Sequence, residues 1–280
     1  MDYSYIMRRI VLLVTLMFAW QTFAFSAITV GNKSNTTGVS QEAVTSQTWS
    51  HTVAVASNEL CVMCGITDDT DASPSIGIDS ITYNSVALTK RVEINSVSGG
   101  TDPETHIWTL DSPSIGANNI VVSYASGNTM KVAMCHAIDF GGVDQGTSQD
   151  TAAVSSADAG GGTVTQAIVT ATNGAMIVSA THCKVVGTAV VDASQTEIYE
   201  TEVDGVTNDG ELSSSYESKV TAGSDTQSFT GFGADDATIG VIALRPSTTA
   251  IKTVNDLAKA SVKTVNNLAI SSVKSIKGLE

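Results

Sequence analysis

The sequence predicts an all-β protein, an antiparallel β-sandwich with jelly-roll-like connections. About a dozen short segments rich in Val, Ile and Thr alternate apolar with polar residues, and Gly, Asn, Asp and Ser separate them. Between residues 27 and 247, no segment sustains the apolar period of an amphipathic helix. A barrel is the alternative that the same pattern allows.

The expected strands follow one another at the spacing typical of sandwiches and jelly rolls. Each contains β-branched or aromatic residues that favour the pleated backbone, and turn-forming residues separate it from the next. Their ranges are 48–56, 59–67, 80–94, 105–110, 118–126, 130–140, 162–172, 175–183, 196–202, 214–220, 226–232 and 237–246.

A secretory signal peptide is expected over residues 1–26. Two arginines precede the apolar run of residues 10–20, and small residues at Ala24 and Ser26 precede a cleavage site after Ser26. A membrane anchor is the alternative, but the run is shorter than the ~20 residues needed to cross a bilayer. The predicted location is therefore secreted, extracellular or cell-surface, with the periplasm as an alternative.

Three parts are expected: the signal peptide, a β-sandwich domain over residues 27–247, and a linker with a repeat tail over residues 248–280. The net charge is −14, and the tail has five lysines against two acidic residues, so the negative charge is concentrated in the domain. Because the domain has no basic stripe to neutralise phosphates, the composition argues against a nucleic-acid partner.

The tail repeats the pattern [IV]-K-[TS]-[VI]-x-x-L every eleven residues, starting at Ile251, Val262 and Val273. One interpretation is a helix with an eleven-residue apolar period. The favoured interpretation is β-structure, two short strands around a turn pair in each copy, because Asn, Asp and Gly at the turns suit a primed turn. A single copy cannot bury its own apolar face, so the tail is expected to bind its own domain, another copy or a larger assembly.

The best candidate for a site is the set of four cysteines with the histidines adjacent to two of them, His136 and His182. In an oxidising compartment an even number of cysteines favours disulfides, and the partner expected for Cys64 is Cys135 or Cys183. Zinc is the less favoured alternative: Cys61 and Cys64 are three apart in a strand and point to opposite faces. The disulfide candidates are Cys61, Cys64, Cys135 and Cys183.

Two acidic groups stand out. Asp68, Asp69 and Asp71 place oxygen donors in one loop, where calcium is a candidate ligand, although a solvated acidic turn is the favoured interpretation. Glu200 and Glu202 share one strand face, an arrangement that a glycosidase or a polar outer face would both explain. No other cofactor is expected.

Further catalytic and binding signals are weak. The sequence contains no G-x-S-x-G, no H-E-x-x-H and no phosphate-binding glycine loop. His51 and His106 are expected to pack beside Trp49 and Trp108. A carbohydrate site would need exposed aromatic rings, for which Trp108 and Tyr124 are the candidates.

The order of five segments resembles a recurrent β-sandwich module of exported bacterial and environmental proteins. The segments are TSQTWSHTVAV, SITYNSVALTK, IWTLDSPSIGANNIVVSYAS, AIDFGGVDQGT and GVIALRP, and the GVDQ turn and the ALRP ending are the most specific. The resemblance implies a jelly-roll-like building block of surface and extracellular proteins and carries no catalytic residues. The tail is similar to VKTVNGLA-type repeats of phage structural and bacterial surface proteins.

These observations predict a non-catalytic exported structural or adhesion module. Its tail, residues 251–280, would mediate self-association or docking to a surface assembly. A carbohydrate-binding jelly roll and a virion fibre or decoration protein are the alternatives, and an exported hydrolase is the least favoured.

Overall fold

The computed structural model describes most of the chain between residues 27 and 269. Among the described residues every regular element is a strand, and the strands pair in antiparallel sheets, which confirms the all-β class. The predicted signal peptide lies outside the described residues. These are 27–40, 45–68, 77–96, 103–125, 130–159, 162–204, 209–232, 236–247, 253–254, 257–258, 264–265 and 268–269.

Residues Ala27–Ser247 form one compact unit. Its first half contains two sheets, here called inner sheet 1 (β1-β10-β4-β8-β7, with β2 also paired to β10) and outer sheet 1 (β3-β9-β5-β6). The strands are β1 (Thr29–Asn35), β2 (Val39–Ser40), β3 (Ser46–Val53), β4 (Glu59–Asp68), β5 (Ile78–Tyr83), β6 (Val86–Ala87), β7 (Thr89–Asn95), β8 (Pro103–Asp111), β9 (Gly116–Tyr124) and β10 (Met130–Gly141).

The second half repeats this plan. Inner sheet 2 has the order β11-β18-β13-β16-β15, and outer sheet 2 has the order β12-β17-β14. The strands are β11 (Val154–Ala159), β12 (Thr163–Thr170), β13 (Ala175–Cys183), β14 (Val190–Val191), β15 (Thr196–Val203), β16 (Gly210–Lys219), β17 (Gly223–Thr230) and β18 (Asp236–Leu244).

The two halves have the same connection order. In each inner sheet the first strand of the half pairs with the last, which in turn pairs with the third principal strand. The corresponding strands β3 and β12 even share one residue-by-residue alternation of exposed and buried positions. The compact unit therefore contains an internal structural repeat of two halves, which the strand pattern of the sequence does not reveal.

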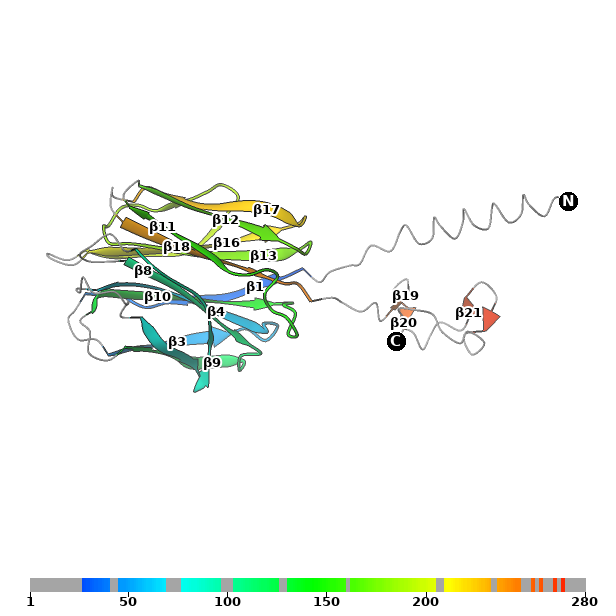
Figure 1. Cartoon of the computed structure of the whole chain (residues 1–280). Coiled ribbons are helices and arrows are strands. Elements are labelled where there is room, and N and C mark those ends of the chain that lie inside the picture. Colours follow the sequence, from blue (N-terminus) through cyan, green and yellow to red (C-terminus); the bar gives the residue numbers. More distant parts are fainter. Residues whose placement is uncertain are drawn as a thin grey trace. The chain divides into compact units, whose positions relative to one another are not determined.

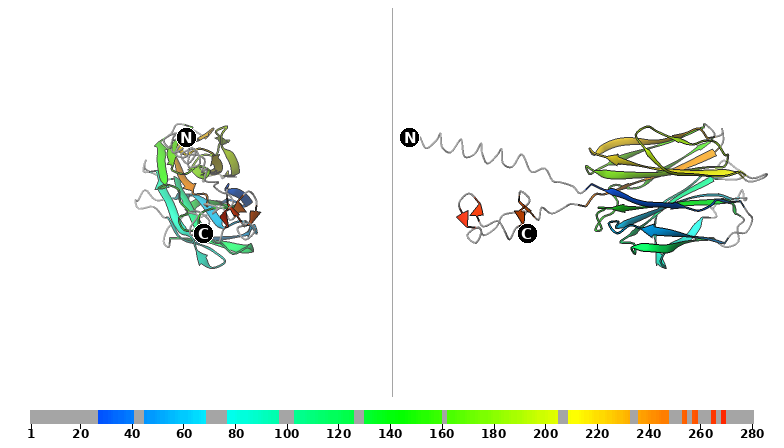
Figure 2. Two further views of the ribbon diagram at one scale, coloured as in Figure 1. Left: turned by 90° about the vertical axis from the view of Figure 1, so that its right-hand side faces the viewer. Right: turned by 180° about the vertical axis from the view of Figure 1, so that it is seen from behind.

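The four sheets stack in the order outer 1, inner 1, inner 2, outer 2 (Figures 1 and 2). Three apolar layers fill the spaces between them. Met63, Ile107 and Ile242 lie between the two inner sheets, while Val62 and Ile120 lie between inner sheet 1 and outer sheet 1, and Phe229 and Val241 fill the second half. Stacked antiparallel sheets of this kind fit the predicted β-sandwich.

One expected strand is divided by a turn. The sequence predicts a continuous strand over residues 80–94, but the structure has β5, β6 and β7 there. Asn84 and Ser85 have φ values of 49° and 63°, as both central residues of a type I′ hairpin require. The prediction was wrong because the two turn residues sit inside an otherwise β-branched run.

The GVDQ and ALRP segments come together where the two halves join. Val143 forms an isolated bridge with Pro246, and the Asp144 amide donates to the Arg245 carbonyl at 2.9 Å. The Ser247 amide closes the contact by donating to the Gly142 carbonyl at 2.7 Å. Residues more than a hundred positions apart thus fasten the end of the second half to the start of the connecting segment.

The described part of the tail contains two strand pairs. β19 (Thr253–Val254) pairs with β20 (Leu257–Ala258), and β21 (Thr264–Val265) pairs with β22 (Leu268–Ala269). These pairs occupy corresponding positions of the first two copies of the eleven-residue pattern, where the β interpretation places strands.

Candidate functional site

A buried polar network connects the edge strands β1 and β3 to β10. His51 is 1% exposed and Asp139 is fully buried, and the two side chains meet at 3.0 Å between His51 Nε2 and Asp139 Oδ1. Ser34 Oγ lies 2.8 Å from His51 Nδ1, and Trp49 Nε1 donates to Ser34 Oγ at 3.1 Å. The network spans three strands and joins inner sheet 1 to outer sheet 1.

The donors assign the protons of this network. An indole nitrogen can only donate, so Ser34 Oγ accepts from Trp49 Nε1. The ionised Asp139 carboxylate can only accept, so His51 carries a hydrogen on Nε2 and donates it to Oδ1. The His51 ring is therefore held between a hydroxyl and an ionised carboxylate.

The Asp139 carboxylate accepts hydrogen bonds from two backbone amides and from His51. The Asn32 amide donates to Oδ1 at 2.9 Å and the Ala54 amide donates to Oδ2 at 3.2 Å. Burial alone would raise the pKa of Asp139, but hydrogen bonds from His51, Ser57 and the Ala54 amide outweigh it and hold the pKa below its usual value. Gly31 is required beside this carboxylate, because a Cβ atom there would overlap Asp139 Oδ2.

The order serine, histidine, aspartate is that of a nucleophilic triad, and no local sequence motif signals it. The three residues come from separate strands, so only the fold brings them together. Trp49 holds Ser34 Oγ as a second partner, and the network links two sheets. The buried polar groups of the network satisfy one another.

Two further histidines link the inner sheets. His136 bonds to Ser214 Oγ at 2.7 Å and to Thr201 Oγ1 at 2.9 Å, and burial lowers its pKa to about 3. His182 lies 2.7 Å from Thr67 Oγ1, and burial lowers its pKa to about 4. Both imidazoles are therefore neutral at physiological pH and act as hydrogen-bonding cross-links.

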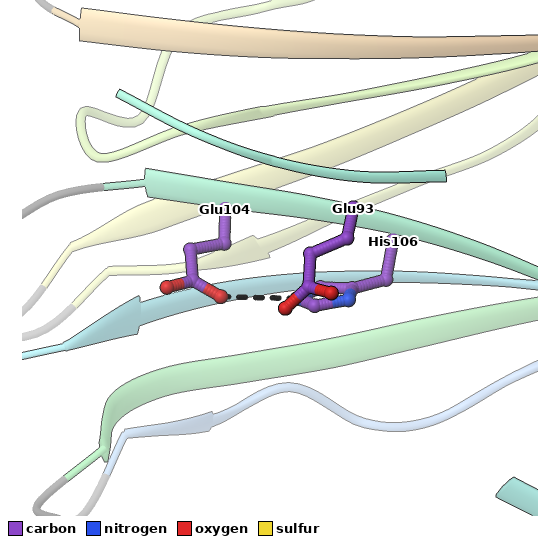
Figure 3. Close-up of side chains that lie close together, drawn as sticks. All are labelled: Glu93, Glu104 and His106. Atoms are coloured by element: carbon purple, nitrogen blue, oxygen red, sulfur yellow. Dashed lines mark hydrogen bonds and ion pairs between the residues drawn. The ribbon is translucent and has the colours of Figure 1, made fainter. Parts of the chain in front are cut away.

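Two groups of side chains place three potential metal ligands within 4.8 Å of one another. The first is Glu93, Glu104 and His106, drawn in Figure 3. The second consists of Glu200, Glu202 and Glu211, where the predicted carboxylate pair of β15 gains a third member from β16.

In the second group the carboxylates compete for one donor. The Ala189 amide donates to Glu200 Oε1 at 2.7 Å and to Glu211 Oε1 at 2.9 Å. Burial raises the pKa of Glu211 to about 7, and the Glu200 carboxyl beside it adds to the shift, while the Gly187 and Ala189 amides oppose it. The pair therefore holds a proton up to neutral pH.

Glu59 is a buried carboxyl at the start of β4. It is fully buried, and neither of its oxygens has a hydrogen-bond partner among the residues that the structure describes. Burial raises the pKa of Glu59 to about 9; the neighbouring Asp111 carboxyl adds to the shift and Arg91 acts against it. Glu59 is therefore protonated at pH 7.

We expect Glu59→Gln to remove a loss of stability that accompanies a rise in pH from about 4.5 to about 9. Because the folded pKa lies above the unfolded one, the stability linked to Glu59 is fully present below about pH 4.5 and is lost as pH rises to about 9. Each proton contributes a slope of about 1.4 kcal/mol per pH unit in that range. In thermal melts from pH 5 to pH 9.5, the melting temperature of the variant should rise relative to that of the wild type as the pH increases. The exposed control Glu197→Gln should follow the wild type at every pH. If Glu59→Gln also follows the wild type, the expectation is contradicted.

The cysteines form one disulfide, between Cys64 and Cys135, one of the two partners expected for Cys64. Cys61 and Cys183 are buried and remain thiols. As expected from strand geometry, Cys61 faces the layer between the inner sheets and Cys64 faces outer sheet 1. The disulfide uses two of the thiols on which a cysteine–histidine zinc site would depend.

The predicted ligand-binding aromatics do not form a stacking surface. Trp108 is 5% exposed and Tyr124 is 4% exposed, and both pack in the layer between inner sheet 1 and outer sheet 1. Both occupy buried positions of their strands, Trp108 on β8 and Tyr124 on β9. The hydroxyl of Tyr124 donates to Gln47 Oε1 at 2.6 Å. Of the predicted calcium ligands, Asp68 is the last residue of β4, and Asp69 and Asp71 lie outside the described residues.

No protein-family model matches the chain, and neither curated proteins nor solved structures gave a match. Among the described residues, no helix has the length and apolar character needed to cross a bilayer. The fold and its sites define an all-β protein of stacked antiparallel sheets with a disulfide in its core.

Proposed function

We propose that the protein is a non-catalytic exported structural and adhesion module whose C-terminal repeat mediates self-association or docking to a larger surface assembly. Its location is secreted, extracellular or cell-surface, following the signal peptide expected over residues 1–26. The Cys64–Cys135 disulfide fits an oxidising compartment. The resemblance of the GVDQ and ALRP segments to exported sandwich modules supports the same assignment.

Each half of the compact unit is proposed to be a jelly-roll-like domain. Its strands divide between two facing sheets, and the first strand of the half pairs with the last, as in a double Greek key. Two such halves stacked through their inner sheets make a stiff spacer. The buried histidines and the Thr105–Thr238 hydroxyl pair, 2.8 Å apart, act as polar cross-links between layers.

The observation that carries the docking role is the pair of hairpins in the tail. Each has only two residues in each strand, and the hairpins recur with the eleven-residue pattern. A hairpin this short is not stable alone in water and needs a further surface to cover its apolar side chains. Another copy of the chain or a larger assembly would provide that surface. The proposed function of residues 251–280 is to dock onto it.

We expect deletion of residues 251–280 to abolish assembly while leaving the compact unit folded. Light scattering on the mature protein should give a defined oligomer for the full chain and a monomer for the truncated chain. Circular dichroism should show the same β-sheet signal and the same thermal transition for the full and the truncated chain, because residues 27–247 stay folded in both. Equal masses, together with equal surface attachment, would contradict the docking role. Covalent labelling of Ser34 by a fluorophosphonate probe would contradict the non-catalytic assignment.

A further inference from the structure

Three side chains converge on β7 and β8, at the edge of inner sheet 1. Glu104 and His106 are two residues apart on β8 and therefore point to the same face of the sheet, and Glu93 on β7 is the cross-strand neighbour of His106. One ligand atom from each residue lies within 4.8 Å of the other two. Figure 3 shows the two carboxylates and the imidazole gathered at one place.

The burial of two members sets this group apart from an ordinary acidic surface. Glu104 is 1% exposed and His106 is fully buried. Among the described residues Glu104 Oε2 has His106 Nε2 as its hydrogen-bond partner at 3.0 Å, and His106 Nδ1 has no hydrogen-bond partner. Buried carboxylates are normally neutralised by a cation or a metal ion. A single imidazole hydrogen bond leaves this pair short of positive charge.

A positive group already lies at the exposed side of the cluster. Lys90 Nζ is 2.5 Å from Glu93 Oε2 and 5.3 Å from the centre of the Trp108 ring. The Lys90 and Glu93 side chains are 37% and 35% exposed. An ion pair in such a setting is worth only about 0–1 kcal/mol, so a metal ion can displace the ammonium from Glu93 at small cost.

We propose that Glu93, Glu104 and His106 bind a zinc ion. One imidazole nitrogen and two carboxylate oxygens form a donor set that zinc accepts with three protein ligands and one open position. Calcium is a poorer match, since it takes about six to eight oxygen ligands. The site goes beyond the proposed structural role and does not depend on it. It is also distinct from the cysteine–histidine set, because none of its ligands is a cysteine.

Titration of the metal-free, full-length protein with Zn²⁺ in a calorimeter tests the site. We expect one equivalent to bind and Ca²⁺ to give no comparable heat. Glu93→Gln and Glu104→Gln should each weaken Zn²⁺ binding at least tenfold. Glu202→Gln is the matched control, because it removes the same charge from the second group, which consists of three carboxylates, and should leave Zn²⁺ affinity unchanged.

The Glu93 side chain is 35% exposed, so its variant tests the site without endangering the core; a thermal melt checks that it folds. Failure of the wild type to bind Zn²⁺, or wild-type affinity in Glu93→Gln, overturns the proposal. Loss of binding in Glu202→Gln but not in Glu93→Gln also overturns it, by placing the ion at the second group. Neither result bears on assembly through residues 251–280.

Discussion

Replacing Cys64 and Cys135 together by alanine is expected to lower the free energy of unfolding by about 4 kcal/mol. The disulfide joins β4 to β10, two neighbouring strands of inner sheet 1, across a sequence separation of 71 residues. Its main contribution is to restrict the unfolded chain, because opening a loop of this length restores a large conformational entropy to that state. The cross-link also fastens the third principal strand of the first half to its last.

Urea unfolding of the protein with and without reductant measures the contribution of the disulfide to the free energy of unfolding. The wild type should lose stability on reduction, while the double variant should unfold at the same urea concentration in both conditions. Cys61→Ala is the control: it removes a buried thiol from the same strand without breaking a cross-link, and should cost on the order of 1 kcal/mol.

Thiol titration gives an independent check on the same cross-link. The unfolded wild type should show two reactive thiols before reduction, those of Cys61 and Cys183, and four afterwards. Four thiols before reduction, with urea curves that do not respond to reductant, would show that the disulfide does not form.

Local pattern was sufficient for the class of the fold and for most strands. β13 begins and ends where predicted, because its apolar run is flanked by turn residues on both sides. The alternation rule also placed Cys61 and Cys64 on opposite faces of the strand. Alternation depends on residues close in sequence, so a single chain suffices to apply it.

The internal repeat and the polar sites could not be predicted from the local sequence pattern. The edge strands β1 and β11 have short polar sequences, TVGNKSN and VSSADA, without the β-branched runs that signal a strand. The strand that opens each half was therefore missing from the predicted set. Ser34, His51 and Asp139 meet only because β10 lies beside β1 and faces β3. Glu93 meets His106 through the register of β7 and β8, which a bulge between Lys90 and Val92 shifts.

The second large effect is expected from Asp139→Asn, which should lower the free energy of unfolding by about 3 kcal/mol at pH 7. The amide replaces a carboxylate oxygen with a donor. It then either faces the donors of His51 and Asn32 or faces the Ala54 amide. In both orientations a buried donor loses its acceptor, and Gly31 lies too close for the side chain to move aside.

The pH dependence separates lost charge from altered packing. The pKa of Asp139 is depressed in the folded protein, so the stability that its ionised form contributes is present above its unfolded pKa and is lost as pH falls through the folded pKa. Urea unfolding at pH 7 and in acid should therefore show a wide gap between wild type and Asp139→Asn that narrows in acid. The exposed control Asp79→Asn should show almost no gap at either pH. A gap of equal size at both pH values would mean that shape, rather than the ionised carboxylate, holds β1, β3 and β10 together.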